Sequence, residues 1–264
     1  MRIITFLSDF GDGSPYPAAM KGAAAAICDA AFIDISHDVP PQSIRGGAYL
    51  LWSAAPVFPS GTVHCAVVDP GVGTERAALA VTSGAQMFVG PDNGLLLPAA
   101  HRLGTPSVFR LTNPAYRRIP VSRTFHGRDV FAPAAAYLAS GIAPQAMGEP
   151  AETYVDLTFP MGRRSGADLV GEVLWVDPFG NLITSIPGHL LDDWTPGRAA
   201  MVEAGGPGRT PLRAAVAGTF GDVARGEAVV LIGSDGLVEV AVNTGSAAAG
   251  TGAAPGSPVR ICPG

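Results

Sequence analysis

Residues 62–71, TVHCAVVDPG, contain the pattern on which the fold prediction rests. Thr62–Val68 is mostly apolar and rich in β-branched residues, a composition typical of a buried strand. Asp69-Pro70-Gly71 follows it directly, and these three residue types favour a tight turn. The stretch therefore predicts a strand that ends in a polar loop.

Other segments of the first half alternate between strand-like and helix-like patterns. The expected strands are Ile3–Leu7, Ala31–Ile35, Ala78–Thr82 and Gln86–Val89, and the expected helices are Tyr16–Cys28, Ser43–Ser53 and Ala134–Ala139. Strands that alternate with helices predict an α/β domain with a mostly parallel sheet. Ligands bind beyond the carboxyl ends of the strands in such sheets, and that is where Ser8-Asp9, His37-Asp38 and Asp69 fall.

The pattern changes after about Val155, where short apolar runs are separated by Gly and Pro turns. The expected strands there are Leu169–Val176, Leu182–Ile186, Ala199–Val202, Ala228–Ile232, Leu237–Val242 and Val259–Ile261. With no long helix between them, these runs predict a β-barrel or a sandwich. We expect an α/β domain over residues 1–160, a linker at Pro160–Ala167 and a β-barrel domain over 168–264. Gly245–Pro258 is either a low-complexity stretch or a short Ala-rich helix.

Composition limits the classes of function. The chain has 264 residues, 47% of them hydrophobic and 15% charged, which is enough for one large domain or two ordinary ones. A net charge of −5 without a Lys/Arg cluster argues against a nucleic-acid partner. No window is apolar over the roughly 18 residues of a membrane span, so no membrane partner is expected. Three separated cysteines predict buried, reduced thiols in a cytoplasmic protein.

Three loops carry residues suited to chemistry or binding. The loop 68–76 presents Asp69 and Arg76 around two glycines, although a capping Asp and a solvated Arg are the plainer interpretation. The segment 123–129 places His126 between Phe125 and Gly127, where the imidazole is either a proton carrier or a partner of a backbone carbonyl. The turn 177–181, DPFGN, ends in an Asn that either forms the turn or binds a ligand.

Two other kinds of site are disfavoured. Gly71-Val72-Gly73 has neither the third Gly of a dinucleotide fingerprint nor the Lys of a phosphate-binding loop. Metal binding is a rival hypothesis, because oxygen and nitrogen donors are present in the first half. No helical metal spacing such as HExxH occurs, so metal-free chemistry is favoured. The candidate ligands are Asp9, Asp12, His37, Asp38, His64, Asp69 and His126.

Taken together, the segments resemble the S-adenosyl-L-methionine hydroxide adenosyltransferase family, which is related to the fluorinase and the chlorinase. The strings that carry the resemblance run in the same order along nearly the whole chain. They are FLSDFGDGSPY (6–16), MKGA (20–23), DISHDVPP (34–41), FPSGTVHCAVVDPGVGTER (58–76), VGPDNGLL (89–96), TFHGRDVFAPAAAYLASG (124–141), VDPFGNLITSI (176–186) and IGSDGLVEVAVNTGSAA (232–248).

The resemblance implies an N-terminal α/β domain, a C-terminal β-barrel and a homotrimer with sites between neighbouring subunits. It also implies hydrolysis of S-adenosyl-L-methionine to adenosine and methionine, with no cofactor and no metal. The family's catalytic Asp, Arg and His fall on Asp69, Arg76 and His126. In the corresponding halogenases, a Tyr-Ser or Tyr-Gly pair stands where this chain has His126-Gly127, so water is favoured over a halide as nucleophile.

The implied substrate-binding residues come from both halves of the chain. Asp9 corresponds to a carboxylate that bonds the ribose hydroxyls, Phe179 stacks near the adenine, and Ser234 contacts the methionine carboxylate. The remaining members of the set are Phe125, Asp177, Asn181 and Asn243, with backbone at Thr244. One departure from the family pattern is Ser185, at a position that is often Asn.

These residue types suit displacement at a sulfonium. The thioether departs neutral and needs no acid, so the enzyme must align and activate water. Arg76 can stabilise a developing hydroxide, His126 can accept the proton, and Asp69 can orient either group. Two alternatives stay open at this point: a halogenase-type adenosyltransferase, and a binding protein for a nucleoside or for S-adenosylmethionine that performs no chemistry.

Overall fold

The computed structural model describes residues 1–194, 199–206 and 208–264. It divides into two compact units, Met1–Thr158 and Phe159–Gly264. Each unit buries its own apolar core, as expected for segments that could fold as separate domains.

The first unit is built on a six-stranded mixed sheet in the order β2-β1-β3-β5-β4-β6. Four neighbouring strands, β2, β1, β3 and β5, run parallel, and β4 runs antiparallel between β5 and β6. The mostly parallel α/β prediction is therefore confirmed. The strands are β1 Ile3–Ser8, β2 Ala31–Ser36, β3 Val63–Val67, β4 Ala78–Ser83, β5 Gln86–Pro91 and β6 Ser107–Arg110.

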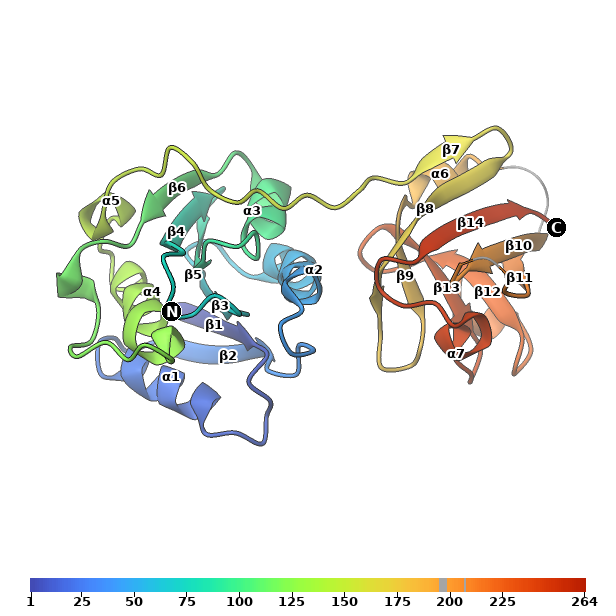
Figure 1. The fold of residues 1–264 in the computed structure, drawn as a ribbon. Coiled ribbons are helices and arrows are strands. Elements are labelled where there is room, and N and C mark those ends of the chain that lie inside the picture. The colour runs from blue at the N-terminus through green and yellow to red at the C-terminus, as the bar shows by residue number, and fades with distance from the viewer. Residues whose placement is uncertain (195–198, 207) are drawn as a thin grey trace. The chain divides into compact units, whose positions relative to one another are not determined.

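Helices cover both faces of this sheet (Figure 1). On one side α1 packs on α4, and on the other side α2 packs on α3. Because β1 and β3 lie between the two helical layers, their residues are buried throughout, as is typical of central parallel strands. The helices are α1 Tyr16–Ala25, α2 Ile44–Ala54, α3 Leu97–Leu103, α4 Ala132–Ala139 and α5 Pro144–Met147, with short turns at Ala55–Val57 and Pro114–Tyr116 and a π-helical turn at Gly127–Phe131.

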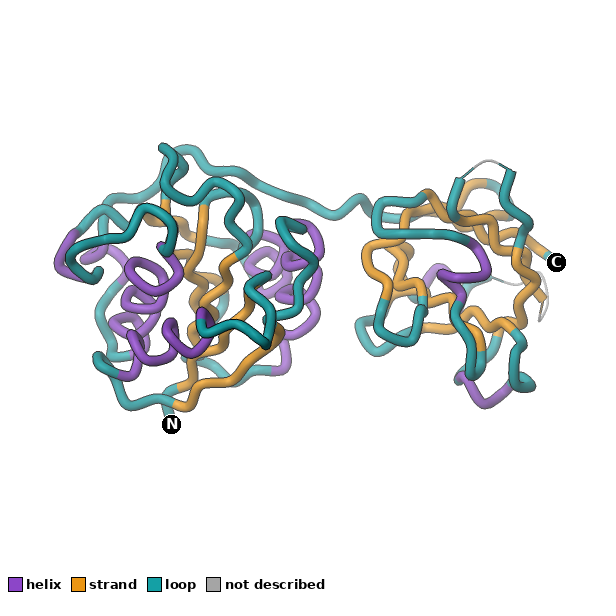
Figure 2. The backbone as a smooth tube through the Cα atoms, turned by 60° about the horizontal axis from the view of Figure 1, so that its bottom comes forward, coloured by secondary structure: helices purple, strands orange, loops and turns teal. Residues whose placement is uncertain are grey.

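The second unit is a β-barrel. Its sheet runs in the order β14-β10-β11-β12-β13-β9-β8-β7, and pairing of β14 with β8 closes seven of these strands into a ring (Figure 2). This decides between the barrel and the sandwich. The strands are β7 Arg163–Ser165, β8 Asp168–Val176, β9 Leu182–Pro187, β10 Ala199–Ala204, β11 Leu212–Val216, β12 Ala228–Ile232, β13 Leu237–Val242 and β14 Pro258–Pro263, with helical turns α6 His189–Asp192, η4 Phe220–Asp222 and α7 Ala247–Thr251.

Several elements differ from the sequence predictions. The predicted linker Pro160–Ala167 contains β7, which forms a hairpin with β8. The Ala-rich alternative for Gly245–Pro258 is correct, because Ser246 caps α7 through its hydroxyl. Helix α1 ends at Ala25, short of the predicted Cys28, and helix α3 and strands β6 and β11 were not predicted at all.

All three cysteines are free, as predicted, but they are not all buried. Cys28 and Cys65 lie in the core, whereas Cys262 on β14 is half-buried. Strand β14 alternates between core-facing and outward-facing residues, and Cys262 follows Ile261, which faces the core. Among the described residues, no helix is long and apolar enough to cross a lipid bilayer.

Candidate active site

The polar residues predicted at strand ends meet at one edge of the first unit's sheet. Strand β1 pairs in parallel with β2 and with β3, and Leu7 lies opposite Ser36 while Ser8 lies opposite Val67. The chain therefore leaves all three strands at the same edge. Asp9, His37 and Asp69 follow there, as expected for a ligand site in a parallel sheet.

A guanidinium joins the three candidate catalytic side chains. Arg76 donates from Nε to Asp69 Oδ1 at 2.8 Å and from Nη2 to Asp69 Oδ2, which makes the ion pair bidentate. Arg76 Nη2 also lies 3.0 Å from His126 Nδ1. The Arg76 side chain is 11% exposed and that of Asp69 is 4% exposed. The structure thus brings together residues that lie 7 and 50 positions apart in the sequence.

The direction of the Arg76–His126 contact follows from the groups involved. A guanidinium has only donors, so His126 Nδ1 must accept. Burial, followed by the positive charge of Arg76, lowers the pKa of His126 below its usual value, although Asp69 opposes the shift. The imidazole is therefore neutral at pH 7, with its proton on Nε2. Nδ1 can accept a second proton only after Arg76 Nη2 has turned away from it.

Backbone contacts hold the Asp69–Arg76 loop against the segment that carries His126. Gly73 has a positive φ of 77°, and a Cβ there would lie 2.3 Å from the carbonyl oxygen of Arg123. Only glycine permits both the conformation and this approach. Arg76 Nη1 also donates to the carbonyl of Ala77 at 3.0 Å, and its guanidinium lies 5.1 Å from the Phe131 ring. The loop is thereby fixed at both ends.

Phe125 belongs to an aromatic cluster beside His126. Its ring meets those of Phe10 and Tyr16 edge to face, with centroids 5.8 and 5.1 Å apart. Gly127 allows this packing, because a Cβ there would lie 3.1 Å from Met20 Sδ and 3.3 Å from the Phe125 ring. The π-helical turn that begins at Gly127 then leads into α4. Such turns occur often at functional sites.

Asp9 lies at the end of β1, with its carboxylate held by the backbone. Its Oδ2 accepts from the Gln42 N–H at 2.8 Å. Beneath it, Ser8 Oγ lies 2.7 Å from His37 Nδ1, and His37 Nε2 lies 3.0 Å from Asp34 Oδ1. Ser8 and His37 are buried, so this hydrogen-bonded chain supports the loop from inside. The sequence did not predict it.

The residues named as candidate ligands in the disfavoured metal hypothesis do not form one cluster. His64 lies in the core between Thr5 Oγ1 and Gln86 Oε1, at 2.7 Å from each. His37 is used by Ser8 and Asp34. Within residues 1–194, 199–206 and 208–264, no three His, Cys, Asp or Glu side chains are arranged to hold a metal ion. The oxygen and nitrogen side chains that suggested a metal site thus take part in separate hydrogen-bonded groups.

In the second unit, the DPFGN turn borders a cavity of about 570 Å³. Asp177 shapes the turn, since its Oδ1 accepts from the N–H groups of Phe179 and Asn181 and its Oδ2 from the Asn181 amide. Phe179 is 77% exposed and lines the cavity with Asn181 and Asn243. An aromatic ring and two amide side chains at one cavity form the mixture of apolar and polar groups that is typical of a ligand site.

Not every predicted binding residue lines this cavity. Ser234 lies in the turn between β12 and β13, outside the lining. Ser185 is also absent from it, because its side chain is buried and accepts from the Glu172 N–H at 3.1 Å. Conversely, Phe220 and Thr244 line the cavity and were missed as side chains. The positive φ of Thr244, 58°, has no signature in a single sequence.

The fold and these two clusters define a class: an α/β unit in which a largely buried carboxylate–guanidinium pair contacts a half-buried imidazole, followed by a β-barrel with an aromatic cavity. Models of one family match both units. Residues 4–148 match the SAM hydroxide adenosyltransferase N-terminal domain, and residues 171–260 match the C-terminal domain. The chain belongs to the SAM hydroxide adenosyltransferase family.

Similar proteins whose activity is given by their names support the family membership. The chain is 45% identical to a protein of Thermus thermophilus named (R)-S-adenosyl-L-methionine hydrolase, over 99% of this chain and 100% of the relative. A Salinispora tropica protein of the same name is 45% identical over 99% of this chain and 98% of the relative. A protein named fluorinase from Actinopolyspora mzabensis is more distant, at 27% identity over 98% of this chain and 96% of the relative.

A solved structure shares the whole fold. The crystal structure of an uncharacterized conserved protein from Thermotoga maritima aligns with a TM-score of 0.92 and 37% identity, covering 98% of this chain and 99% of that one. Together with the family models, this likeness confirms the resemblance found in the sequence strings.

Proposed function

We propose that the protein hydrolyses S-adenosyl-L-methionine to adenosine and L-methionine. The observation that carries the proposal is the contact of one buried guanidinium, that of Arg76, with both Asp69 and His126. It occurs in a chain whose relatives at 45% identity are named hydrolases of this compound. The halogenase and binding-only alternatives are disfavoured, since the nearer relatives carry the hydrolase name and the fluorinase is more distant.

The reaction needs a nucleophile aligned behind C5' of the ribose. Oxygen of a water molecule forms the bond to C5' while the C5'–S bond breaks, and its electron pair passes to sulfur. The sulfonium thus becomes the neutral thioether of methionine, and the water loses one proton. Alignment of the reactants accounts for much of the acceleration in such a displacement.

Asp69, Arg76 and His126 have separate tasks in this step. Three of the five guanidinium N–H groups of Arg76 are directed to Asp69 and His126, and a fourth to Ala77 O. The second Nη1 hydrogen has no partner among the described residues, and we assign it to the attacking oxygen. When Arg76 Nη2 turns to water, His126 Nδ1 becomes a base that can take the proton.

We assign recognition of the nucleoside to the barrel cavity. Phe179 and Phe220 offer aromatic faces to a purine, and the Asn181 amide offers donors and an acceptor. Asp177 supports this surface and, with Ser234, is our candidate for the methionine end. Asp9 and Phe125, on the first unit, are our candidates for the ribose side of the substrate.

The names of the relatives refine the substrate. The sulfonium of S-adenosyl-L-methionine is pyramidal and therefore has two configurations, and the relatives are named for the R form. We propose that this chain also prefers the R epimer. We further propose a cytoplasmic homotrimer that uses no cofactor or metal, in which the catalytic triad of one subunit serves a site shared with a neighbouring subunit.

Product analysis with each epimer tests the proposal. Purified protein is incubated with the R or the S epimer, with and without a chelator, and with added chloride or fluoride. Equal amounts of adenosine and methionine, faster from the R epimer and unaffected by the chelator, are expected. A halonucleoside would support the halogenase alternative, binding without turnover would support a sensor, and loss of activity in the chelator would contradict metal-independence.

A further inference from the structure

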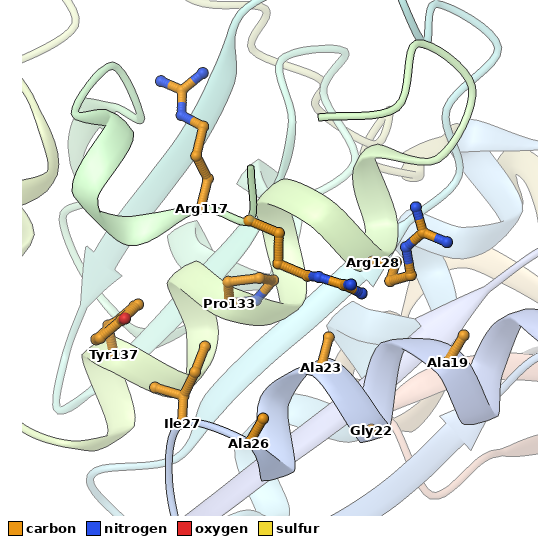
Figure 3. A pocket seen from close by; sticks show the side chains of 10 residues that line it. Ala19, Gly22, Ala23, Ala26, Ile27, Arg117, Arg128, Pro133 and Tyr137 are labelled. Carbon is orange, nitrogen blue, oxygen red and sulfur yellow. The ribbon is translucent and has the colours of Figure 1, made fainter. Parts of the chain in front are cut away.

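A second cavity in the first unit lies between α1 and the start of α4, and none of the candidate active-site residues lines it. Its volume is about 510 Å³, which falls in the range of cavities that hold small molecules. Figure 3 shows the small side chains of α1 along one wall, with Arg128 toward the Ala19 end and Tyr137 and Ile27 toward the other.

The wall formed by α1 is kept open by its sequence. Ala19, Gly22, Ala23 and Ala26 recur at the spacing of one helix face and all line the cavity. Gly22 shows that there is open space beside the helix, because a Cβ at this position would meet nothing within 4 Å. Glycine inside a helix costs about 1 kcal/mol relative to alanine. The chain therefore keeps an unfavourable residue where a side chain would only occupy the cavity.

The other side of the cavity carries positive charge. Arg117, Arg118 and Arg128 line it, and no Asp or Glu is among the lining residues. The guanidinium of Arg117 turns away from α1 (Figure 3) and donates to the carbonyls of Leu111 and Thr112, so only Arg118 and Arg128 bring charge to the cavity. Arg128 forms a bidentate pair with the buried carboxylate of Asp129, at 2.7 and 2.8 Å, while Arg118 stands 3.9 Å from it. The guanidinium groups of Arg118 and Arg128 and the carboxylate of Asp129 leave one positive charge at the cavity.

We propose that this cavity binds an organic phosphate. An anionic phosphoryl group matches the excess positive charge, and guanidinium groups bind phosphate oxygens through paired N–H donors. The side chain of Arg118 is 52% exposed and can turn toward such a group. Arg128 can donate hydrogen bonds to the phosphate while it remains paired with Asp129. The apolar or aromatic body of the ligand then packs against α1 and the ring of Tyr137. This site is additional to the proposed hydrolase site and does not depend on it.

Isothermal titration with three probes tests the proposal: phenyl phosphate, inorganic phosphate and benzyl alcohol. Phenyl phosphate is expected to bind with one-to-one stoichiometry, inorganic phosphate more weakly, and benzyl alcohol without detectable heat. Gly22→Leu fills the cavity from the helix wall and should abolish binding of phenyl phosphate. Arg118→Gln should raise its Kd by at least about tenfold, the effect of losing one charge-assisted hydrogen bond.

Controls locate the binding. Arg225→Gln removes an exposed arginine of the barrel unit and should leave the Kd unchanged. Gly22→Leu should keep the thermal midpoint and the turnover of the unaltered protein, since it adds a good helix former in open space. Absence of phenyl phosphate binding in the unaltered protein would overturn the proposal, as would equal binding by Gly22→Leu. If a second copy of the chain covered this cavity in solution, phenyl phosphate would not bind to the unaltered protein, and the proposal would fail.

Discussion

The two units carry candidate sites of different kinds: ionisable side chains in the first, and exposed aromatic rings and amides in the second. In the first, three ionisable side chains from two separate segments contact one another, with those of Asp69 and Arg76 almost excluded from solvent and His126 half-buried. In the second, the cavity is bordered by exposed rings and amides on turns between strands. Charges that must act on a bond need a fixed, dry setting, whereas recognition of a flat ring needs surface. We therefore expect mutations at the first site to lower kcat and stability, and mutations at the second site mainly to raise KM.

The largest effect is expected from Arg76. Arg76→Lys keeps the charge but loses the fork that holds Asp69 and His126, so kcat should fall by about 10²- to 10³-fold. Arg76→Ala should in addition lower the stability of the first unit by about 3–5 kcal/mol, because it leaves Asp69 buried and unpaired. Steady-state kinetics and thermal unfolding measure both effects, with Arg225→Lys as the exposed control. A kcat within twofold of normal in Arg76→Lys would remove this residue from the chemistry.

Lowering the pH should change the free energies of unfolding of the two units in opposite directions. Burial lowers the pKa of His64 to about 4, so between pH 6.5 and about 4 the unfolded first unit binds a proton that the folded one does not. That unit should lose about 3 kcal/mol over this window. Burial, with Asp177 and Asp235, raises the pKa of Glu239 in the barrel. The folded barrel then holds its proton at higher pH than the unfolded chain, so acidification through that pKa stabilises it.

Hydrogen exchange resolved by peptide distinguishes the units in this test. Protection should fall in β1, β3 and β5 as the pH is lowered from 6.5 to 4, after correction for the intrinsic exchange rate, and should hold or rise in β12 and β13. His64→Leu cannot titrate and should remove most of the slope in the first unit, although it lowers stability at every pH. Parallel loss of protection in both units would contradict the contrast.

Phe179 should affect binding without affecting the fold. Because its ring is 77% exposed, Phe179→Ala should change stability by no more than about 0.5 kcal/mol. Loss of a stacking face should raise KM about tenfold with little change in kcat. Met161→Ala, which truncates another exposed side chain of the barrel unit, is the matched control. A large fall in kcat with unchanged KM would place Phe179 in the chemical step instead.

The smallest kinetic effect is expected at Ser185. Its hydroxyl lies 2.7 Å from the position a Cβ would take on Gly171, inside the packed barrel wall. Ser185→Asn restores the residue often found in the family, but it overfills this site and should cost about 1–3 kcal/mol. KM should stay within about twofold of normal. A marked fall in KM would show that this position does reach the substrate.

The sequence was most informative where one physical requirement dominated the pattern. The central strands were predictable because β1 and β3 are buried on both faces and must be apolar throughout. Strands β6, β7 and β11 were missed since they are short, at least partly exposed and lack a continuous apolar run. The early end of α1 was missed because Ala26–Cys28 has helix-compatible residues and no breaker. Such boundaries are set by the tertiary turn into β2.

The candidate site shows the same division. Asp69, Arg76 and His126 were predicted from strings that resemble a family, and their contact is a property of the fold that spacing alone does not reveal. The roles assigned to them stay predictions. Phe220 was missed because a turn residue between strands has no periodicity to mark it as a ligand wall. The Ser8–His37–Asp34 chain was missed since hydrogen-bond partners across strands depend on register.

The origin of the 5'-oxygen in adenosine shows whether water attacks C5'. Turnover of (R)-S-adenosyl-L-methionine in water enriched in ¹⁸O, followed by mass spectrometry, reports which bond the water has formed. We expect one ¹⁸O in the 5'-hydroxyl of adenosine, none in methionine, and no such product from Arg76→Ala. Adenosine without the label, or label in an amino-acid product, would contradict attack of water at C5'.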